Sequence, residues 1–465
     1  MVSLEQVSSK IGDGIHGTPK YDENGSYYFI NGNNLSSGRV VITTSTKKVS
    51  YEEYVKHKKE INSSTILLSI NGTIGNVAIY NHEPIILGKS ACYINVHSNV
   101  NVNYIGYVLK DKKFQNYIKQ QANGSTIKNV SLKLVREFKF PLPPKLQQDQ
   151  IAGILCSLDK KITINEHISQ TLQQMAQALF KSWFVDFEPV KAKIAALDAG
   201  GSQKEATLAA MSVISGKDAD ALAVLEQEHS EKYDELKAIA KLFPAAMQES
   251  DHGDIPVEWT YTNLSSLALL NSSSWSKKNA PDSLNYVDLA NTKWGIIHSI
   301  EQYLFADAPS RARRVLKAGD TIVGTVRPGN GSYAFITENN LTGSTGFAVL
   351  TPKEPHFSTF VYICATSEDN IERLAHLADG GAYPAVNSEV VLTTPCIIPA
   401  DYNVSKKLIS IFHHYTKFLF DHKKNTSLQN KTLEEIRDVL LPNILCGKTY
   451  LSNLTTSSNK IKEGA

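Results

Sequence analysis

The sequence has few features of a secreted, membrane-spanning or disulfide-stabilised protein. No apolar run is long enough to cross a bilayer, and the first residues, Met1–Leu4, do not begin a signal peptide. The cysteines are odd in number, scattered and never in a C-x-x-C pair, which excludes a disulfide framework and a zinc ribbon. They are Cys92, Cys156, Cys364, Cys396 and Cys446. We therefore expect reduced thiols and a cytoplasmic location.

The sequence also lacks a nucleotide-binding loop. Gly88-Lys89-Ser90 and Gly447-Lys448-Thr449 both resemble the end of a phosphate-binding loop. That loop needs a glycine five residues before the Gly-Lys pair, and Glu83 and Pro442 occupy those positions. Both matches are therefore rejected.

Other catalytic constellations are missing as well. His413 and His414 are adjacent, so they project differently from a helix and are poorly placed to share a metal. The segment Glu137–Lys139 imitates the end of a nuclease carboxylate motif, but no second carboxylate precedes it at a suitable strand position. The Asn-Pro-Pro-aromatic motif of adenine methyltransferases is absent. We expect no catalytic residue, no metal and no cofactor in this chain.

The most informative feature present is an internal repeat of about half the chain of 465 residues, at an offset of about 256 residues. Landmarks in one order support it. Thr65–Ser69 matches Thr321–Thr325, Gly88–Ser90 matches Gly343–Thr345, Asn123–Ser125 matches Asp379–Gly381, and Tyr28–Ile30 matches Tyr286–Asp288. The chain therefore predicts two tandem copies of one module.

Each copy has a mixed pattern of strands and helices. Thr65–Ser69 and Val77–Tyr80 are β-branched and apolar, and Tyr104–Gln121 has helical spacing. The second copy repeats this at Thr321–Val326, Tyr333–Ile336 and Ser358–Asp379. The predicted class is α+β, with two tandem mixed α/β modules.

Each copy ends in a long helix with a heptad pattern, at about 150–180 and 405–441. Both apolar seams become polar in the middle, which is typical of coiled-coil packing with a fixed register. If a pseudo-two-fold axis relates the copies, the helices pair antiparallel; alternatively, each packs on its own module. The predicted spacer-helix residues are Ile151, Leu155, Leu158, Ile162, Leu172, Leu179, Leu408, Phe412, Tyr415, Leu419, Leu433, Ile436 and Leu440.

The formal net charge is only +2, so composition alone does not indicate a nucleic-acid partner. Local charge is more informative. The segment 110–139 is strongly basic, and the second copy carries Arg311, Arg313, Arg314 and Arg327. Aromatic residues lie between these cations, as on phosphate-contacting surfaces. A solvated charged surface is the alternative for any one cluster, but finding a cluster in both copies favours DNA.

One segment resembles a known family. The run Phe140–Pro144, Gln147, Gln148, Ile151, Leu158–Ile162 and Asn165, continuing through Leu172 and Met175 to Leu179–Pro189, is similar to the central conserved region of type I restriction-modification specificity (S) subunits. Leu242–Pro244 and Gly253–Trp259 resemble that family's entry to its second target-recognition domain. The second helix departs most, because Cys396–Pro399 has one proline fewer than Phe140–Pro144.

The resemblance implies a non-catalytic subunit that binds double-stranded DNA. Each target-recognition domain would read half of a bipartite site, while the helices set the spacer and dock two methyltransferase subunits. Those partners would carry S-adenosylmethionine, and motor-nuclease subunits would join their complex with this chain. The expected domains are target-recognition domain 1 at 1–145, a central spacer helix at 146–189, a helical insert at 190–250, target-recognition domain 2 at 251–402, a C-terminal spacer helix at 403–447 and a disordered tail at 448–465.

Within this resemblance, polar loop residues are the candidates for DNA contact. They are Asn31, Asn33, Asn34, Lys89, Ser125, Lys128 and Asn129 in the first module, and Arg311, Arg313, Arg314, Arg327, Asn330, Ser344, Tyr383 and Asn387 in the second.

Two other functions remain open from the residues alone: a coiled-coil adaptor that does not bind DNA, and a stand-alone metal-dependent nuclease. The segment 190–247 has no counterpart in the second half. It predicts an added helical hairpin, either a partner-docking face or a plain structural insert.

Overall fold

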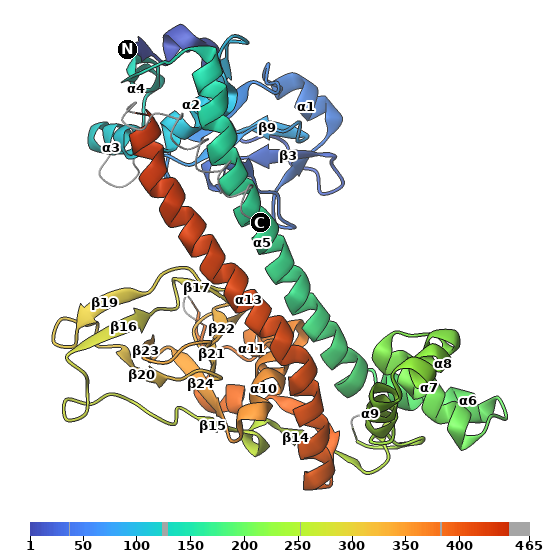
Figure 1. Cartoon of the computed structure of the whole chain (residues 1–465). Coiled ribbons are helices and arrows are strands. Elements are labelled where there is room, and N and C mark those ends of the chain that lie inside the picture. Colours follow the sequence, from blue (N-terminus) through green and yellow to red (C-terminus); the bar gives the residue numbers. More distant parts are fainter. Residues whose placement is uncertain (37, 123–128, 252, 382–383, 446–465) are drawn as a thin grey trace, which may run out of the picture. The chain divides into compact units, whose positions relative to one another are not determined.

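A computed structural model describes residues 1–36, 38–122, 129–251, 253–381 and 384–445. The chain divides into two compact units. Unit 1 is Met1–Asn165 together with the segment that begins at Leu428, and unit 2 is Glu166–Ser427. Two long helices, α5 and α13 (the stem helices), contribute residues to both units (Figure 1). They span Lys145–Phe184 and Tyr402–Leu445.

Unit 1 is built on a four-stranded antiparallel sheet and a smaller mixed sheet. The first has the order β2-β10-β7-β8, and the second β6-β3-β9 with β3 and β9 parallel. Short pairs β1–β11 and β4–β5 complete it. The strands are β1 (Val2–Ser3), β2 (Ser8–Asp13), β3 (Tyr27–Ile30), β4 (Leu35–Ser36), β5 (Arg39–Val40), β6 (Lys48–Val49), β7 (Thr65–Ser69), β8 (Val77–Ile79), β9 (Ile85–Leu87), β10 (Ala91–Val96) and β11 (Lys139–Phe140).

Helices cover the larger sheet of unit 1. Apolar side chains of β2, β7 and β10 pack against helices α2 and α3 in one core. The predicted single helix over 104–121 is wrong, because Asp111 ends α2 and its carboxylate accepts the backbone N–H of Lys113 to cap α3. The helices are α1 (Tyr51–His57), α2 (Val102–Lys110), α3 (Lys112–Gln121) and α4 (Leu132–Glu137).

Unit 2 repeats this plan. Its sheets have the orders β15-β24-β21-β22 and β19-β16-β23-β20, with β16 and β23 parallel. The strands are β12 (Met247–Gln248), β13 (Ile255–Pro256), β14 (Trp259–Asn263), β15 (Ala268–Leu270), β16 (Ser283–Val287), β17 (Thr292–Lys293), β18 (Ile296–Ile297), β19 (Glu301–Leu304), β20 (Ala312–Leu316), β21 (Thr321–Gly324), β22 (Tyr333–Phe335), β23 (Leu341–Ser344), β24 (Phe347–Pro352) and β25 (Pro395–Pro399). The module helices are α10 (Ser358–Ala365), α11 (Glu368–His376) and α12 (Ser388–Leu392).

The predicted repeat is confirmed at the level of strand order. β2, β10, β7 and β8 correspond to β15, β24, β21 and β22, and β7 and β21 begin 256 residues apart. Two landmarks were misaligned by a residue. Val287 pairs with Gly343 as Ile30 pairs with Leu87, so Val287 corresponds to Ile30 and not to Phe29, and Gly343 corresponds to Leu87 and not to Gly88.

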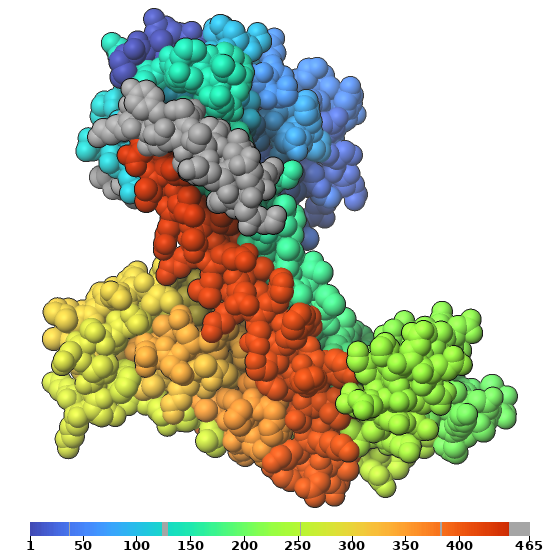
Figure 2. Space-filling view, in the orientation of Figure 1, coloured from blue at the N-terminus to red at the C-terminus, as the bar shows by residue number. Residues whose placement is uncertain are grey.

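The insert of unit 2 holds four helices where a hairpin was predicted. Gly216, at a positive φ of 67°, ends the second helix, and Asp218 caps the third. The last three of these helices have a small core of their own, around Met211 and Tyr233, whereas Val190 of the first is buried in the large core of unit 2, and the insert forms a protruding lobe (Figure 2). They are α6 (Glu188–Asp198), α7 (Gln203–Ser215), α8 (Ala219–Glu228) and α9 (Ser230–Ala240).

The segment most similar to the S-subunit family forms the corner between α5 and this insert. Phe187 has a positive φ of 54° and lies between the two helices, and Pro189 lies in the first turn of α6. Trp183, Phe184 and Phe187 are buried in the largest core of unit 2. Phe184 meets Phe412 of α13 edge-on, with ring centroids 5.4 Å apart. The family motif is therefore a packing element of this unit.

The stem helices pair antiparallel within each unit. In unit 1, Asp159 and Asn165 of α5 contact Arg437 and Asn430 of α13. In unit 2, Ser169 and Gln173 contact Thr426 and Lys423. Partner numbers fall as α5 numbers rise, as the antiparallel prediction requires.

The seam differs from prediction in α13. On α5, Ile151, Leu155 and Ile162 are buried and Leu158, Leu172 and Leu179 are half-buried. On α13, Leu408 and Phe412 are buried, whereas Tyr415 and Ile436 are 45% and 42% exposed. Leu419, Leu433 and Leu440 are half-buried. The heptad series predicted to face α5, which repeats every seven residues from Leu408, is wrong by one residue, because the side chains that contact α5 include Lys423, Asn430 and Arg437. Leu408 and Ile409 are both buried against the module, so Leu408 does not mark the seam.

The seam is polar in its middle, as predicted. Asn165 is 1% exposed, and its amide donates to the side-chain oxygen of Asn430 at 2.8 Å. Ser169 and Thr426 exchange a hydroxyl hydrogen bond of 2.8 Å. Such pairs favour one register, because an apolar residue opposite either would leave a buried polar group unpaired.

Among the described residues, no helix combines the length and apolar character needed to cross a membrane.

Candidate nucleic-acid interface

In unit 1, loops that follow β3, β7 and β9 meet at one sheet edge. The hydroxyl of Ser90 accepts the backbone N–H of Gly32 at 2.9 Å and donates to the side chain of Asn31 at 2.8 Å. The N–H of Ile70 donates to the carbonyl of Ser90 at 3.0 Å. These bonds tie three separate loops into one surface, which we call the unit 1 loop edge.

Not every predicted residue on this edge is available to a ligand. Asn31 and Asn34 form the capping box of a short 3-10 helix, with the N–H of Asn31 donating to the side chain of Asn34 at 3.0 Å. Asn33, Lys89 and Asn129 are exposed. The remaining candidates of this module, Ser125 and Lys128, lie outside the described residues.

The sequence predicted the turn between β7 and β8, but we did not count its residues among the candidates for DNA contact. Asn71 forms an isolated β-bridge with Asn129, which brings this turn to the loop edge, and Gly72 and Thr73 are exposed. The Asn-Gly pair marked the turn, but only the bridge across the sequence places it beside the other loops.

Unit 2 presents the corresponding edge with different side chains. Arg311 lies beside the loop after β23, where its carbonyl accepts the N–H of Thr345 at 2.8 Å. Its guanidinium is 64% exposed and lies 3.8 Å from the Asp288 carboxylate. Arg327 has a positive φ of 47°, and its N–H donates to the carbonyl of Pro384. Arg327 and Asn330 are exposed, and we call this surface the unit 2 loop edge.

The other predicted arginines differ in availability. The Arg313 guanidinium lies 4.8 Å from the centre of the Phe305 ring and donates to the carbonyl of Ala312. Arg314 donates to the Ser274 hydroxyl at 3.4 Å, and burial lowers its pKa. Arg313 therefore has a planar support, whereas Arg314 is partly enclosed.

Of the three remaining candidates of unit 2, one is buried, one is exposed but caps a helix, and one lies outside the described residues. Ser344, at the end of β23, is 0% exposed, and its hydroxyl accepts the N–H of Gly346, so this side chain is not available to DNA. Asn387 caps α12 by accepting the N–H of Glu389. Tyr383 lies outside the described residues. A serine in a turn-like sequence was taken for a loop residue, although it is the last residue of β23.

The hairpin β17–β18 was also missed. The amine of Lys293 donates to the carbonyl of Asn330 at 3.3 Å, so the hairpin touches the unit 2 loop edge. Trp294 is 56% exposed and has a positive φ of 49°. No apolar periodicity marks such a short hairpin, so only its Trp-Gly turn could have indicated it.

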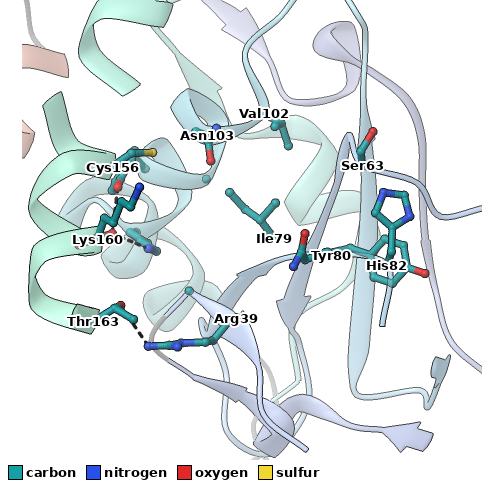
Figure 3. Close-up of a pocket in the computed structure, with 16 residues that line it drawn as sticks. Arg39, Ser63, Ile79, Tyr80, His82, Val102, Asn103, Cys156, Lys160 and Thr163 are labelled. Carbon is teal, nitrogen blue, oxygen red and sulfur yellow. Dashed lines mark hydrogen bonds and ion pairs between the residues drawn. The ribbon is translucent and has the colours of Figure 1, made fainter. Parts of the chain in front are cut away.

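Unit 1 also has a cavity of about 440 Å³ where the module meets α5 (Figure 3). Arg39 reaches from β5 to the Thr163 hydroxyl of α5 at 3.1 Å. Tyr107 donates to the Asp159 carboxylate at 2.9 Å, and Lys110 lies 3.4 Å from it. Burial and the Asp159 charge raise the pKa of Tyr107, which keeps its hydroxyl a donor.

Among the described residues, no group of three His, Cys, Asp or Glu side chains could hold a metal ion. The geometry offers exposed cations and amides on two loop edges, which suit phosphate oxygens and base edges.

Comparisons with known proteins agree on one family. The family model of the type I restriction modification DNA specificity domain matches residues 2–174. The chain is 30% identical over 379 residues to the type I restriction enzyme HindI specificity subunit of Haemophilus influenzae, covering 77% of this chain and 80% of that protein.

Shorter and structural likenesses accompany it. The MjaIX specificity subunit of Methanocaldococcus jannaschii is 33% identical over 127 residues, 27% of this chain and 29% of that protein. A crystal structure of the type I restriction-modification S subunit from M. genitalium aligns over 95% of this chain and 94% of that one, with 14% identity and a TM-score of 0.46. The family does not favour an adaptor or a nuclease. On the extent of the HindI match, this chain belongs to the family of type I restriction-modification specificity subunits.

Proposed function

We propose that this chain is the non-catalytic subunit that gives a type I restriction-modification complex its DNA sequence specificity, with each module reading one half of a bipartite site. The observation that carries the proposal is the loop edge, which recurs at equivalent positions of two modules of one strand order. The side chains on the two edges differ, so the half-sites are expected to differ.

On each edge, phosphate and base contacts fall to different residues. Lys89 in unit 1 and Arg311 in unit 2 are exposed cations suited to phosphates. Asn33, Asn129 and Asn330 are exposed amides, which can pair with adenine edges in the major groove. Arg313 on its Phe305 support is a candidate for guanine.

The stem helices are proposed to dock two methyltransferase subunits and to set the spacer between half-sites. In unit 2, α13 exposes Phe418 at 69% and Tyr415 at 45%. In unit 1, the same helix exposes Val439 at 62% and Ile436 at 42%. Each residue of the first pair lies 21 residues, or three heptads, before its counterpart, so both pairs occupy the same heptad positions. An apolar pair presented twice fits two copies of one partner.

The remaining parts of the proposal concern the assembly. S-adenosylmethionine is expected in the methyltransferase subunits and not in this chain, motor-nuclease subunits are expected to bind that core complex, and the complex is expected in the cytoplasm. The family name and the paired apolar sites support the partners.

Long-read mapping of methyl-adenine in cells with and without this gene tests the proposal. One bipartite motif should lose methylation when the gene is removed and regain it when the gene is restored. The purified chain alone should transfer no methyl group, but should direct its partner methyltransferase to that motif. Binding should weaken steeply with salt. An unchanged methylome would refute the proposal.

A further inference from the structure

In each unit, a short hairpin connects the module to the stem helices. In unit 1 it is β4–β5, which we call docking hairpin 1. The carbonyl of Gly38 accepts the N–H of Ile79 at 3.0 Å, which holds the hairpin along β8. On the loop-edge side, Asn34 donates to the carbonyl of Val41 at 3.3 Å. This hairpin is therefore joined to both the sheet and the unit 1 loop edge.

The glycine of docking hairpin 1 rests on a junction of charged side chains from three helices. Gly38 has a φ of +82°, and a Cβ placed there would lie 2.8 Å from the Lys110 amine of α2. Lys110 and Arg437 of α13 both contact the carboxylate of Asp159 on α5, at 3.4 and 3.0 Å. Arg39 adds its bond to Thr163 on the same helix, beside the cavity in Figure 3. We call Lys110, Asp159 and Arg437 junction 1.

Unit 2 repeats the arrangement with other side chains. The hairpin β17–β18, docking hairpin 2, carries Gly295 at a φ of +81°. A Cβ there would lie 2.8 Å from the Tyr362 hydroxyl of α10, 3.2 Å from the Gln173 side-chain oxygen of α5 and 3.4 Å from the Lys423 amine of α13. Lys423 donates to Gln173. We call Gln173, Tyr362 and Lys423 junction 2.

Junction 2 is enclosed. Tyr362 is 1% exposed, and its hydroxyl has no hydrogen-bond partner among the described residues. Burial also lowers the pKa of Lys423. Docking hairpin 2 is held to its sheet by the N–H groups of Trp294 and Gly295, which donate to the carbonyls of Gly331 and Tyr333 at 2.7 and 2.9 Å. Gly331 directly follows Asn330 of the unit 2 loop edge.

The two junctions share geometry and not residues. In each unit, one glycine at positive φ approaches a polar group from a module helix, and polar groups from both stem helices complete the junction. A side chain at either glycine would have to displace the polar side-chain ends of its junction or the hairpin itself, and the hairpin is bonded to the loop edge. Displacement at the junction therefore reaches the loops without a change in any DNA-contacting residue.

We propose that the docking hairpins are positioning elements, in which Gly38 and Gly295 seat each recognition module on its three-helix junction and so fix the direction of the loop edge relative to the stem helices of the same unit. This proposal rests on the proposed function. Gly38, Gly295 and the junction residues are positioning residues, and they specify spacer tolerance and not the bases of the half-sites.

The test compares Gly38→Ala and Gly295→Ala with a matched control, Gly200→Ala. Gly200 lies in the insert at a φ of +82° and a Cβ there meets nothing within 4 Å, so the control has the same backbone strain without the contact. Each chain is purified with its methyltransferase, and methyl transfer is measured on duplexes whose spacer is native, one base pair longer or one shorter.

We expect each docking-hairpin variant to lose about tenfold of its preference for the native spacer, since the backbone strain and the contact both displace the hairpin. Gly200→Ala should keep the wild-type preference. If the docking-hairpin variants lower the rate on all three spacers equally, or match Gly200→Ala, the proposal is wrong.

A second measurement does not depend on DNA. Hydrogen exchange at the Trp294 and Gly295 amides should become faster in Gly295→Ala and stay unchanged in Gly200→Ala. The reason is that the close contact of Gly295 with junction 2 keeps those N–H groups on their carbonyls. Unchanged exchange would overturn the proposal even if the alanine variants cannot be assembled with the methyltransferase. A wild-type complex that prefers no DNA sequence would instead refute the proposed function. The exchange result would still test whether Gly295 holds docking hairpin 2 on its junction.

Discussion

Replacing Arg437 tests whether junction 1 stabilises unit 1. The Arg437 guanidinium donates to Asp159 across the stem helices at 3.0 Å, and the two side chains are 28% and 27% exposed. This pair is intermediate between an exposed pair, which contributes about 0–1 kcal/mol, and a buried one, whose disruption costs about 3–5 kcal/mol. Arg437→Met should therefore destabilise unit 1 by about 2 kcal/mol, because Asp159 would stay three-quarters covered with one cation fewer.

A double-mutant cycle separates the pair from simple loss of packing. Asp159→Asn in addition to Arg437→Met removes the uncompensated charge, so the double variant should recover about 1–2 kcal/mol relative to additive losses. The assay is native-state hydrogen exchange of α2 and of the unit 1 parts of α5 and α13, which reports local opening free energies. Lys145→Met, in an exposed pair with Asp149, is the control and should cost less than about 0.5 kcal/mol. Strict additivity within about 0.5 kcal/mol would refute the reasoning.

The same pair predicts a pH dependence. Burial raises the pKa of Asp159, but Lys110, the Arg437 and Tyr107 hydrogen bonds and the Arg437 charge outweigh it, so the net pKa lies below the ordinary value of 3.8. A carboxylate with a lowered folded pKa stabilises the protein above its unfolded pKa, and that contribution disappears as pH falls through the folded pKa. The advantage of the wild type over Arg437→Met should be constant near neutral pH and shrink below about pH 4. An advantage that grows in acid would contradict this account.

Three further predictions follow from the stem helices. Burial lowers the pKa of Lys423 from 10.5 to about 8, so the unfolded chain binds more protons between these values and the stability of unit 2 should rise with pH there. Lys423→Met should be the more stable protein below pH 8, by about 1–2 kcal/mol in thermal unfolding, and lose that advantage above pH 10.5. Phe418→Glu should weaken methyltransferase binding at least about tenfold in co-purification, because it places a charge in an apolar contact, whereas Lys431→Glu on the same helix should not. One heptad added to both stem helices, after Asn165 and after Ser427, should lengthen each by about 10 Å and the methylated spacer by about 3 base pairs. Methylome sequencing should find the bases of both half-sites unchanged. Altered bases in either half-site would contradict the role of the stem helices as a spacer.

Local patterns predicted the elements that depend on local chemistry. Thr65–Ser69 is predicted and observed as a strand, because its apolar, β-branched run suits a sheet buried on both faces. The stem helices were predicted from heptads over about 150–180 and 405–441, and both extend beyond those ranges, to Lys145–Phe184 and Tyr402–Leu445, although α5 ends before the predicted domain bound of 189. Their extra turns carry few seam residues, so periodicity did not reveal them.

The predictions that were wrong concern contacts between residues distant in sequence. The heptad series predicted for α13 was displaced by one residue because Leu408 packs on the module, and seven-residue spacing does not distinguish that surface from the partner helix. Asn31 and Asn34 look like free loop amides until their bonds with Ser90 and Val41 are known. The docking hairpins have too few residues for any periodicity, and their glycines acquire a role only when three helices meet there.

Unit 1 is assembled from both ends of the described chain, and this affects how the protein is made. Leu441 and Ile444 of α13 are 8% and 3% exposed in the same core as Tyr104 and Leu155 of the first module. All of unit 2, Glu166–Ser427, is synthesised between the first part of unit 1 and these two side chains. The first module must therefore keep an open apolar surface, available to chaperones, until the last turns of α13 are made, whereas unit 2 needs α13 only as far as Ser427. A chain released early, before α13 is complete, would keep that surface open, and proteases would remove it before it could compete for partner subunits.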